Sequence, residues 1–312
     1  MGSTLARVLL DQGHQVRALD SLLHGGQSVQ GLYMYDDFSF MRGDIREPDT
    51  VREALEGVDA VVHLAAIVGD PACARHPEIA RDVNQHGALQ LYQISQDRGI
   101  ERFIFASTCS NYGRMPDPSA YVTEESDLNP VSLYAETKVA VENHLLDSMD
   151  FSRAAVTVLR FATLYGLSPR MRFDLTVNTF TKEFLTQGKL LVFGEQFWRP
   201  YVHVLDAARA IALVLASPRD KVEGQVFNVG DEDQNYQKGQ LAALVQGQVG
   251  DHMKIEHVDR DEDPRDYRVS FEKIKRELGF QVTRTVEDGV REIMDAINQG
   301  VVTDLDDPHY HN

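Results

Sequence analysis

The chain has 312 residues, 43% of them hydrophobic and 25% charged, which is ordinary for a globular protein of one large domain or two joined ones. Its formal net charge of −17 argues against a nucleic acid or an anionic membrane as partner, because both attract basic proteins. Two cysteines do not make a disulfide framework, and no apolar run is long enough for a membrane span. We therefore expect a cytoplasmic protein and assign no metal site.

The amino-terminal residues predict the second half of a dinucleotide-binding βαβ unit. A helix over residues 4–12 stops at Gly13, and a short strand over 15–20 ends in Asp20. In such a unit the aspartate binds both ribose hydroxyls, although an aspartate here can also cap a turn. The first strand and most of the glycine-rich turn are missing, because the sequence begins at what would be the turn's last glycine, Gly2. Either the true start lies upstream or the strand was lost, and most amides that would hold a pyrophosphate are absent.

Two more predicted strands end in residues that suit a nucleotide. After the first of them, Asp44 and Ile45 lie in a turn that can reach an adenine ring. The continuous apolar run over 59–66 is typical of a buried parallel strand. Small residues near its end permit close approach by a flat ligand, and the candidates there are Leu64, Ala65 and Ala66.

The strand expected over 101–107 carries hydroxyl and thiol groups to its carboxyl end, where open parallel sheets bind ligands: Ser107, Thr108, Cys109 and Ser110. A long helix over 77–99, which includes Asn84, precedes this strand, and another strand is expected over 155–160. This alternation predicts an α/β fold with a doubly wound, Rossmann-like parallel sheet whose first strand is missing.

Tyr134 and Lys138 are four residues apart, so a helix places them on one face. A nearby ammonium favours the phenolate, and we expect it to lower the pKa of the tyrosine towards working pH. The phenol then becomes a general acid or base for a hydroxyl or carbonyl, and a hydroxyl from residues 107–110 can hold the reacting oxygen. Such a pair also arises by chance in many helices, so its meaning depends on the rest of the chain.

The pattern of segments changes after Gly166. We expect residues 1–166 to form the NAD-binding domain, with the chain returning to it at about 200–229. Residues 167–199 and 230–312 are expected to form a smaller α/β substrate domain. Within it, residues 304–312 are expected to be disordered or loosely packed.

Together these residues resemble the extended short-chain dehydrogenase/reductases, in particular the NAD-dependent nucleotide-sugar epimerases and dehydratases. The likeness extends from residue 2 to about 298 and rests on the order and spacing of several short motifs. They are Asp20, Gly43-Asp44, His63 to Ala66, Asn84 with Gly87, Ser107-Thr108 with Tyr112-Gly113, Tyr134 with Lys138, Arg160-Phe161 with Tyr165-Gly166, Arg199 to His203, and Tyr267 to Phe280.

The resemblance implies a bound NAD that takes a hydride from C4 of the sugar and leaves a 4-keto intermediate. Tyr134 would be the base, Lys138 would hold the nicotinamide ribose, and Thr108 would bind the reacting oxygen. Asn84 and Ser107 would belong to the cofactor site. For the nucleotide diphosphate it implies Asn178, Arg199 and Arg260, with Arg172 and Arg265 as weaker candidates.

The fate of the 4-keto intermediate depends on the residues after Thr108. In the family's 4,6-dehydratases an Asp-Glu pair follows, whereas here Cys109 and Ser110 do, which favours simple C4 epimerisation. A thiol can act as acid or base, so a dehydratase or C3/C5-epimerase that uses Cys109 remains an alternative; otherwise Cys109 is a buried filler. A non-catalytic relative that only binds nucleotide sugars is a further alternative. The resemblance also implies a homodimer paired through the Tyr134 helix, with which the apolar positions Val139, Val141 and Leu145 are compatible.

Overall fold

The computed structural model describes residues 1–312 except 116, 118–119, 149–153, 251–253 and 259–264. Its strands are β1 (Val16–Asp20), β2 (Phe38–Arg42), β3 (Ala60–His63), β4 (Arg102–Thr108), β5 (Ala155–Phe161), β6 (Thr163–Tyr165), β7 (Lys189–Phe193), β8 (Trp198–His203), β9 (Gln225–Val229), β10 (Asn235–Gln237) and β11 (Lys254–Val258).

The helices are α1 (Gly2–Asp11), α2 (Gln27–Gln30), α3 (Pro48–Ala54), α4 (Asp70–Arg75), α5 (Pro77–Arg81), α6 (Ala88–Asp97), α7 (Leu133–Asp147), α8 (Thr176–Gln187), α9 (Val204–Ala216), α10 (Arg219–Val222), α11 (Lys238–Val249), α12 (Glu272–Leu278) and α13 (Val286–Asn298). Short helical turns are η1 (Gly31–Met34), η2 (Asp82–Gly87, a π turn), η3 (Cys109–Tyr112), η4 (Glu232–Gln234) and η5 (Pro308–Tyr310). Among the residues described, no helix combines the length and the apolar character needed to cross a membrane.

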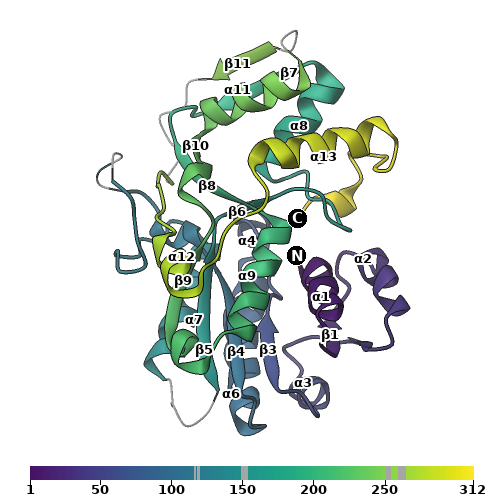
Figure 1. Cartoon of the computed structure of the whole chain (residues 1–312), viewed down its shortest axis with the longest axis vertical. Coiled ribbons are helices and arrows are strands. Elements are labelled where there is room, and N and C mark those ends of the chain that lie inside the picture. The colour runs from purple at the N-terminus through teal and green to yellow at the C-terminus, as the bar shows by residue number, and fades with distance from the viewer. Residues whose placement is uncertain (116, 118–119, 149–153, 251–253, 259–264) are drawn as a thin grey trace.

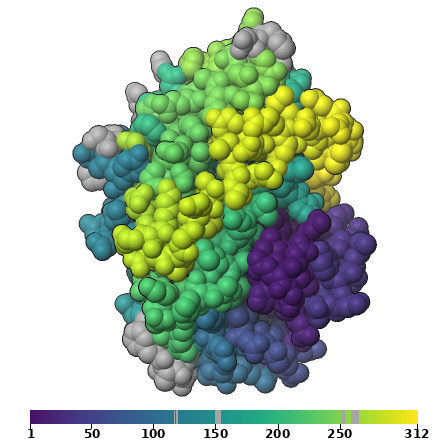
Figure 2. All heavy atoms as spheres, viewed as in Figure 1, coloured from purple at the N-terminus to yellow at the C-terminus, as the bar shows by residue number. Residues whose placement is uncertain are grey.

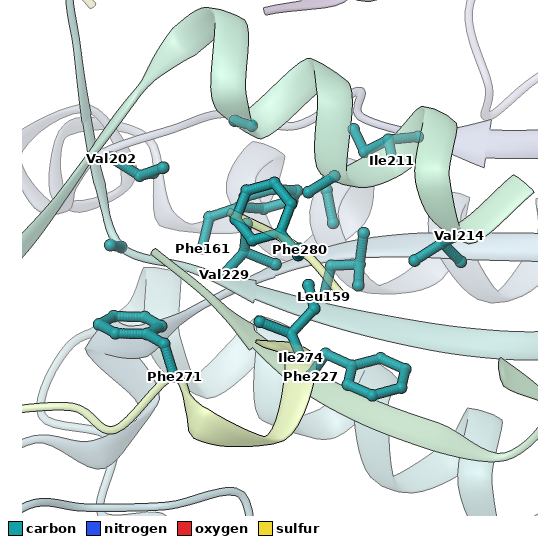
Figure 3. Close-up of a cluster of buried hydrophobic side chains, with 14 of the residues drawn as sticks. Leu159, Phe161, Val202, Ile211, Val214, Phe227, Val229, Phe271, Ile274 and Phe280 are labelled. Atoms are coloured by element: carbon teal, nitrogen blue, oxygen red, sulfur yellow. The ribbon is translucent and has the colours of Figure 1, made fainter. Parts of the chain in front are cut away.

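A parallel sheet with the order β3-β4-β5-β9 forms the centre of the lower part of the molecule (Figure 1). Both faces of β4 are covered, because successive side chains point to opposite sides. Phe103 and Phe105 pack against α3, α6 and α7, whereas Ile104 and Ala106 pack against α1 and α9. Figure 3 shows the second of these clusters, in which side chains of β5 and β9 lie between α9 and α12. The doubly wound parallel architecture predicted from the sequence is therefore confirmed.

The amino-terminal segment forms a separate parallel pair, β1-β2, beside this sheet. In the described part of the chain no ladder joins β1 to β3. Helix α1 connects the two sheets: Leu5 and Leu9 belong to the cluster of the central sheet, whereas Ala6 and Leu10 pack with Leu32 over β1 and β2. Figure 2 shows this segment as a purple lobe against the green surface that includes α9. The gap agrees with the prediction of a missing first strand, since the order of such sheets places that strand between β1 and β3.

The upper part of the molecule contains the mixed sheet β10-β8-β6 and the parallel pair β11-β7 (Figure 1). Its core lies among α8, α11 and α13 and includes Tyr165, Phe184, Leu241 and Val290. The chain crosses between the two parts more than once, because β9 pairs with β5 of the central sheet after β8 has paired with β6.

The carboxyl-terminal residues 304–312 pack against the body of the protein, so the prediction of a disordered or loosely packed tail is wrong. The amide of Phe173 donates a hydrogen bond to the carbonyl of Tyr310 at 2.9 Å, and their rings meet edge to face. Lys182 donates to the carbonyl of Leu305 at 2.9 Å. These contacts involve residues more than a hundred positions away, which local composition cannot indicate.

Candidate active site

A cleft of about 2180 Å³ lies where the upper part of the molecule meets the carboxyl ends of the central strands, and it continues between β1 and β3. Part of this volume is the gap between β1 and β3, so the whole cleft is larger than the roughly 300–1000 Å³ of an ordinary small-molecule pocket. Residues of β1, β3, β4 and α7 line it together with residues of the loop after β6. The predicted site residues that the structure describes lie in or beside this cleft.

Tyr134 and Lys138 both line the cleft from the first turns of α7. The helix begins here because the hydroxyl of Ser132 accepts a hydrogen bond from the amide of Ala135. Lys138 is buried; its Nζ donates to the carbonyl of Ala106 at 2.8 Å and lies 5.9 Å from the centre of the Tyr134 ring. In the structure the two side chains thus lie on one face of α7, as predicted.

The expectation that the pKa of Tyr134 is lowered is wrong for the ligand-free protein. Burial in the cleft wall raises the pKa of the phenol above its ordinary value. Burial also lowers the pKa of Lys138, from 10.5 to about 8, although Glu142 and Cys73 act against this shift. Removing both groups from water disfavours their charged forms, and in this state that outweighs their mutual attraction.

Thr108 and Ser110 line the cleft at the carboxyl end of β4. The Thr108 hydroxyl accepts a hydrogen bond from the amide of Ser110 at 3.1 Å, which caps the turn η3. Tyr267 donates from its hydroxyl to that of Ser110 at 3.3 Å. The cleft therefore presents two hydroxyls with defined positions near Tyr134.

Cys109 does not face the cleft. It is 1% exposed, belongs to the apolar cluster behind the sheet, and donates from its thiol to the carbonyl of Arg160 at 3.2 Å. Burial raises the pKa of this thiol well above its ordinary value. This position contradicts an acid or base role for Cys109 and supports the interpretation of a buried filler.

A buried polar network lies one turn beyond Lys138 on α7 and was missed in the sequence. Glu142 accepts from Arg160 through Nη2 at 2.7 Å and Nε at 3.0 Å, and from Nδ2 of Asn111 at 2.6 Å. It also accepts from the hydroxyl of Ser107, which lines the cleft. Glu142 is one turn beyond Lys138, so the same four-residue spacing that marked the Tyr/Lys pair could have revealed it. The network fixes the end of β4 against α7.

The cofactor side of the cleft contains the predicted acidic residues in different states. Asp20 is exposed at the end of β1, and its Oδ1 accepts from the amide of Leu22 at 2.7 Å. Asp44 binds Arg46 with both oxygens, at 2.7 and 3.0 Å, and these hydrogen bonds hold the pKa of Asp44 below its usual value. An adenine amino group would therefore compete with Arg46. Ile45, Leu64, Ala65 and Ala66 also line the cleft.

Gly2 lies at the start of a helix on this side, and Asn84 lies within the π turn η2. Gly2 opens α1 and lines the cleft, and no side chain caps this helix, so its first amides are available to an anion. Asn84 is 1% exposed and does not line the cleft; its amide bonds the N–H and the carbonyl of Ile67, at 2.7 and 2.9 Å. The predicted helix over 77–99 is interrupted there by the π turn η2. Asn84 thus orders the loop after β3, and its assignment to the cofactor site stays a prediction.

The substrate side contains Asn178 and Arg199 of the three residues predicted for a diphosphate; Arg260 lies outside the described residues. Asn178 lines the cleft, but its amide accepts from the N–H of Gly166 and donates to the carbonyl of Arg172, both at 3.0 Å. It therefore shapes the loop. Arg199 donates to the carbonyl of Trp198 at 2.6 Å, and its guanidinium lies 5.4 Å from the ring centre of Tyr267.

The weaker arginine candidates both lie in ion pairs and both line the cleft. Arg172 pairs with Asp174 at 2.6 Å, and Arg265 pairs with Asp70 at 3.0 Å. Within the residues described, no group of three or more His, Cys, Asp or Glu side chains is placed to hold a metal ion.

Comparison with known proteins gives consistent results. A model of the NAD dependent epimerase/dehydratase family matches residues 1–230. The UDP-glucose 4-epimerase of Corynebacterium glutamicum is 28% identical over 91% of this chain and 88% of its own length. The dTDP-glucose 4,6-dehydratase of Streptomyces griseus is also 28% identical, over 93% of this chain and 88% of its own. Sequence identity thus does not separate the two kinds of relative.

Two solved structures of relatives superpose closely on the chain. The dTDP-glucose 4,6-dehydratase from Streptomyces venezuelae, with NAD and TYD bound, gives a TM-score of 0.84 at 26% identity and covers 97% of this chain and 95% of its own. The UDP-glucose 4-epimerase of Thermus thermophilus in complex with NAD gives 0.81 at 26% identity and covers 96% of both chains.

Proposed function

Because this chain belongs to the NAD-dependent epimerase/dehydratase family, we propose that it is a nucleotide-sugar epimerase that uses NAD, a 4-keto intermediate and Tyr134 as the base. The observation that carries the proposal is the position of Lys138, whose Nζ lies 5.9 Å from the centre of the Tyr134 ring and donates to the carbonyl of Ala106 at 2.8 Å, two residues before Thr108 at the end of β4. Asp20 and the uncapped start of α1 also line this cleft, and they suit a ribose and a pyrophosphate.

The residues of the chain divide the work as follows. Tyr134 removes the proton from the C4 hydroxyl and returns it after the sugar has turned its other face. Thr108 donates a hydrogen bond to the same oxygen and holds it near the phenol. Lys138, fixed by the carbonyl of Ala106, stabilises the negative charge that forms on the phenol oxygen when Tyr134 acts as the base. NAD, when bound, supplies the hydride acceptor.

The choice of an epimerase rests on the residues after Thr108. Dehydration needs an acid to protonate the leaving hydroxyl, and the position next to Thr108 carries a thiol that is buried away from the cleft. Ser110 lines the cleft, but a hydroxyl is a weak acid. A dehydratase or C3/C5-epimerase that uses Cys109 is therefore the weaker candidate. A non-catalytic nucleotide-sugar-binding relative is weaker still, because Tyr134, Lys138 and Thr108 all face the cleft.

The proposal includes the organisation of the chain. Residues 1–166, with the return at about 200–229, bind NAD in this scheme, and residues 167–199 and 230–312 bind the nucleotide sugar. We also propose that the protein forms a homodimer and acts in the cytoplasm. Val141 and Leu145 are fully buried within the chain, so these two are not compatible with a place in the interface.

The test is product analysis by mass spectrometry on a panel of UDP- and dTDP-sugars, with NAD added and with released cofactor measured. We expect an isomer of unchanged mass that differs at C4. The choice of epimerase would be overturned if the unmodified protein formed a product lighter than its substrate by one water and the Cys109→Ser variant did not. A protein that binds a nucleotide sugar but neither holds NAD nor changes the sugar would favour the non-catalytic alternative.

A further inference from the structure

The carboxyl-terminal residues 304–312, named here the C-terminal strap, enter the cleft. Leu305 and Tyr310 pack with the cluster of Met171, Phe173 and Ile293, which anchors the strap on the upper part of the molecule. The last two residues of the strap, His311 and Asn312, line the cleft itself. Figure 1 marks this end of the chain near the middle of the molecule, where the two parts meet. The strap therefore has a fixed root and an end that a ligand in the cleft would meet.

Arg170 is held by the end of the strap. Its Nε donates to the carbonyl of His309 at 2.7 Å, and its Nη2 donates to the carbonyl of His311 at 3.0 Å and to Oδ1 of Asn312 at 2.8 Å. All three acceptors are neutral oxygens. A guanidinium binds an anionic oxygen more strongly than a neutral one, and its planar fork fits two oxygens of a phosphate group at once. An anionic ligand can thus replace the strap as the hydrogen-bond partner of Arg170.

The same end of the strap reaches across to the cofactor side. Nδ2 of Asn312 donates to the carbonyl of Val68 at 3.1 Å, and Arg75 donates from Nη2 to the carbonyl of Asn312 at 2.7 Å. Val68 lies in the loop after β3, and Arg75 ends α4. Asn312 therefore links Arg170, from the loop after β6, to the wall of the cofactor side. A ligand that takes Arg170 from the strap also weakens this link.

Positive charge gathers around Arg170 inside the cleft. Burial lowers the pKa of Arg170, and the neighbouring Arg172 lowers it further, although Asp174 acts in the opposite direction. Burial together with Arg170 and Arg172 also lowers the pKa of His24, which lines the same cleft. A bound anion relieves the repulsion between Arg170 and Arg172, whereas the neutral oxygens of the strap relieve little of it.

We propose that Arg170 is an anion-binding residue of this cleft and that the C-terminal strap caps it in the ligand-free protein, so that a diphosphate and the strap compete for one guanidinium. The inference rests on the proposed function only for the source of the diphosphate, which is either NAD or the nucleotide sugar. When that ligand enters, it displaces the strap, and the contacts that Asn312 makes across the cleft are broken.

The test measures dissociation constants by isothermal titration calorimetry for three probes: inorganic pyrophosphate, UDP and NAD. The variants are Arg170→Gln, a truncation after Tyr310 that removes His311 and Asn312, and their combination. The control is Arg52→Gln, an exposed arginine outside the cleft that pairs with Asp49 at 2.6 Å. Thermal melts of every variant separate a local effect from loss of folding.

We expect the truncation to tighten pyrophosphate binding by about threefold to tenfold and Arg170→Gln to weaken it by about tenfold or more. In the combined variant the gain from truncation disappears, and Arg52→Gln behaves as the parent. The source of the diphosphate is the ligand, UDP or NAD, whose dissociation constant changes across the variants in the same way as that of pyrophosphate. Equal affinities of the parent and Arg170→Gln for all three probes, or no gain on truncation, would overturn the inference. If the protein binds pyrophosphate through Arg170 but converts no nucleotide sugar, the proposed function is overturned and this inference still holds.

Discussion

Two arginine–carboxylate pairs of similar geometry differ in burial. Arg160 Nη2 is 2.7 Å from Glu142 Oε2, and these side chains are 5% and 1% exposed. Arg46 Nη2 is also 2.7 Å from Asp44 Oδ2, but here the exposed fractions are 38% and 26%. The first pair lies behind the catalytic residues, and the second lines the wall predicted to bind adenine.

The difference separates two ways of building a site. Around Glu142 every contact is within the protein, so the network sets the positions of Ser107 and the end of β4 before any ligand arrives. Around Asp44 the pair is open to water, which screens it and lets a ligand replace one partner. The catalytic end is thus preorganised, whereas the cofactor end holds its groups in weak contacts that a ligand can exchange.

The largest effect is expected from Tyr134→Phe, at the preorganised end. Loss of the phenol oxygen removes the base, and we expect kcat for epimerisation to fall by about 10²- to 10⁴-fold. The affinity for NAD and the melting temperature should change little, since the ring remains in place. Steady-state kinetics and calorimetry check this, and retention of more than a tenth of the parent kcat would contradict the assignment of the base.

Breaking the two ion pairs tests the comparison directly. Glu142→Gln leaves the buried Arg160 without a charged partner and should lower the free energy of unfolding by about 3–5 kcal/mol. Asp44→Asn is the matched variant at the exposed pair, where the loss should be at most about 1 kcal/mol. Urea unfolding of both variants measures the difference. Similar losses in the two would show that burial does not distinguish these pairs.

The folded protein should gain stability with rising pH through Lys138. Its pKa is about 8 in the ligand-free fold and 10.5 when unfolded, so above pH 8 the unfolded chain binds the extra proton and folding is favoured as pH rises. Between pH 8 and 9.5 the free energy of unfolding of the parent should rise by roughly 2 kcal/mol relative to Lys138→Met. Denaturant unfolding at several pH values measures this, and parallel curves for the two proteins would refute it.

The sequence predicted the features that follow from local residue patterns, namely the buried strands and the shared helix face of the Tyr134 and Lys138 pair. The continuous apolar run before Ala65 and the strand that ends at Ser107-Thr108 became β3 and β4 of a doubly wound sheet, because strands covered on both faces are typically such runs. The helical spacing of Tyr134 and Lys138 placed both in the cleft, since four residues make about one turn.

Features that depend on the tertiary environment were not predictable in this way. The direction of Cys109 is set by η3, which turns its side chain under the sheet, and the pKa of Tyr134 depends on how much water the cleft wall excludes. The local pattern around Asn84 also did not show that its amide bonds the N–H and the carbonyl of Ile67 across a loop. The strap was overlooked because its contacts come from residues far away in the chain.

The smallest predicted effect concerns Asp20, at the end of the cleft that a ligand completes. In the ligand-free protein its Oδ1 caps the turn at Leu22, so both the capping and the ribose interpretation of this residue remain open. Asp20→Ser keeps an oxygen that can accept from that amide but removes the carboxylate. If the carboxylate binds the ribose hydroxyls, Asp20→Ser should weaken NAD by about tenfold with little change in melting temperature, and it should reduce the discrimination against NADP.

A matched Asp20→Ala variant separates the two roles, because it removes the cap as well. If Asp20 only caps the turn, Asp20→Ala lowers the melting temperature, whereas both variants bind NAD as the parent does. Calorimetric titration with NAD and NADP, together with thermal melts, measures both quantities. Unchanged NAD affinity in Asp20→Ser would remove the ribose contact from the proposed site and leave the exposed end of the cleft without a residue that selects its cofactor.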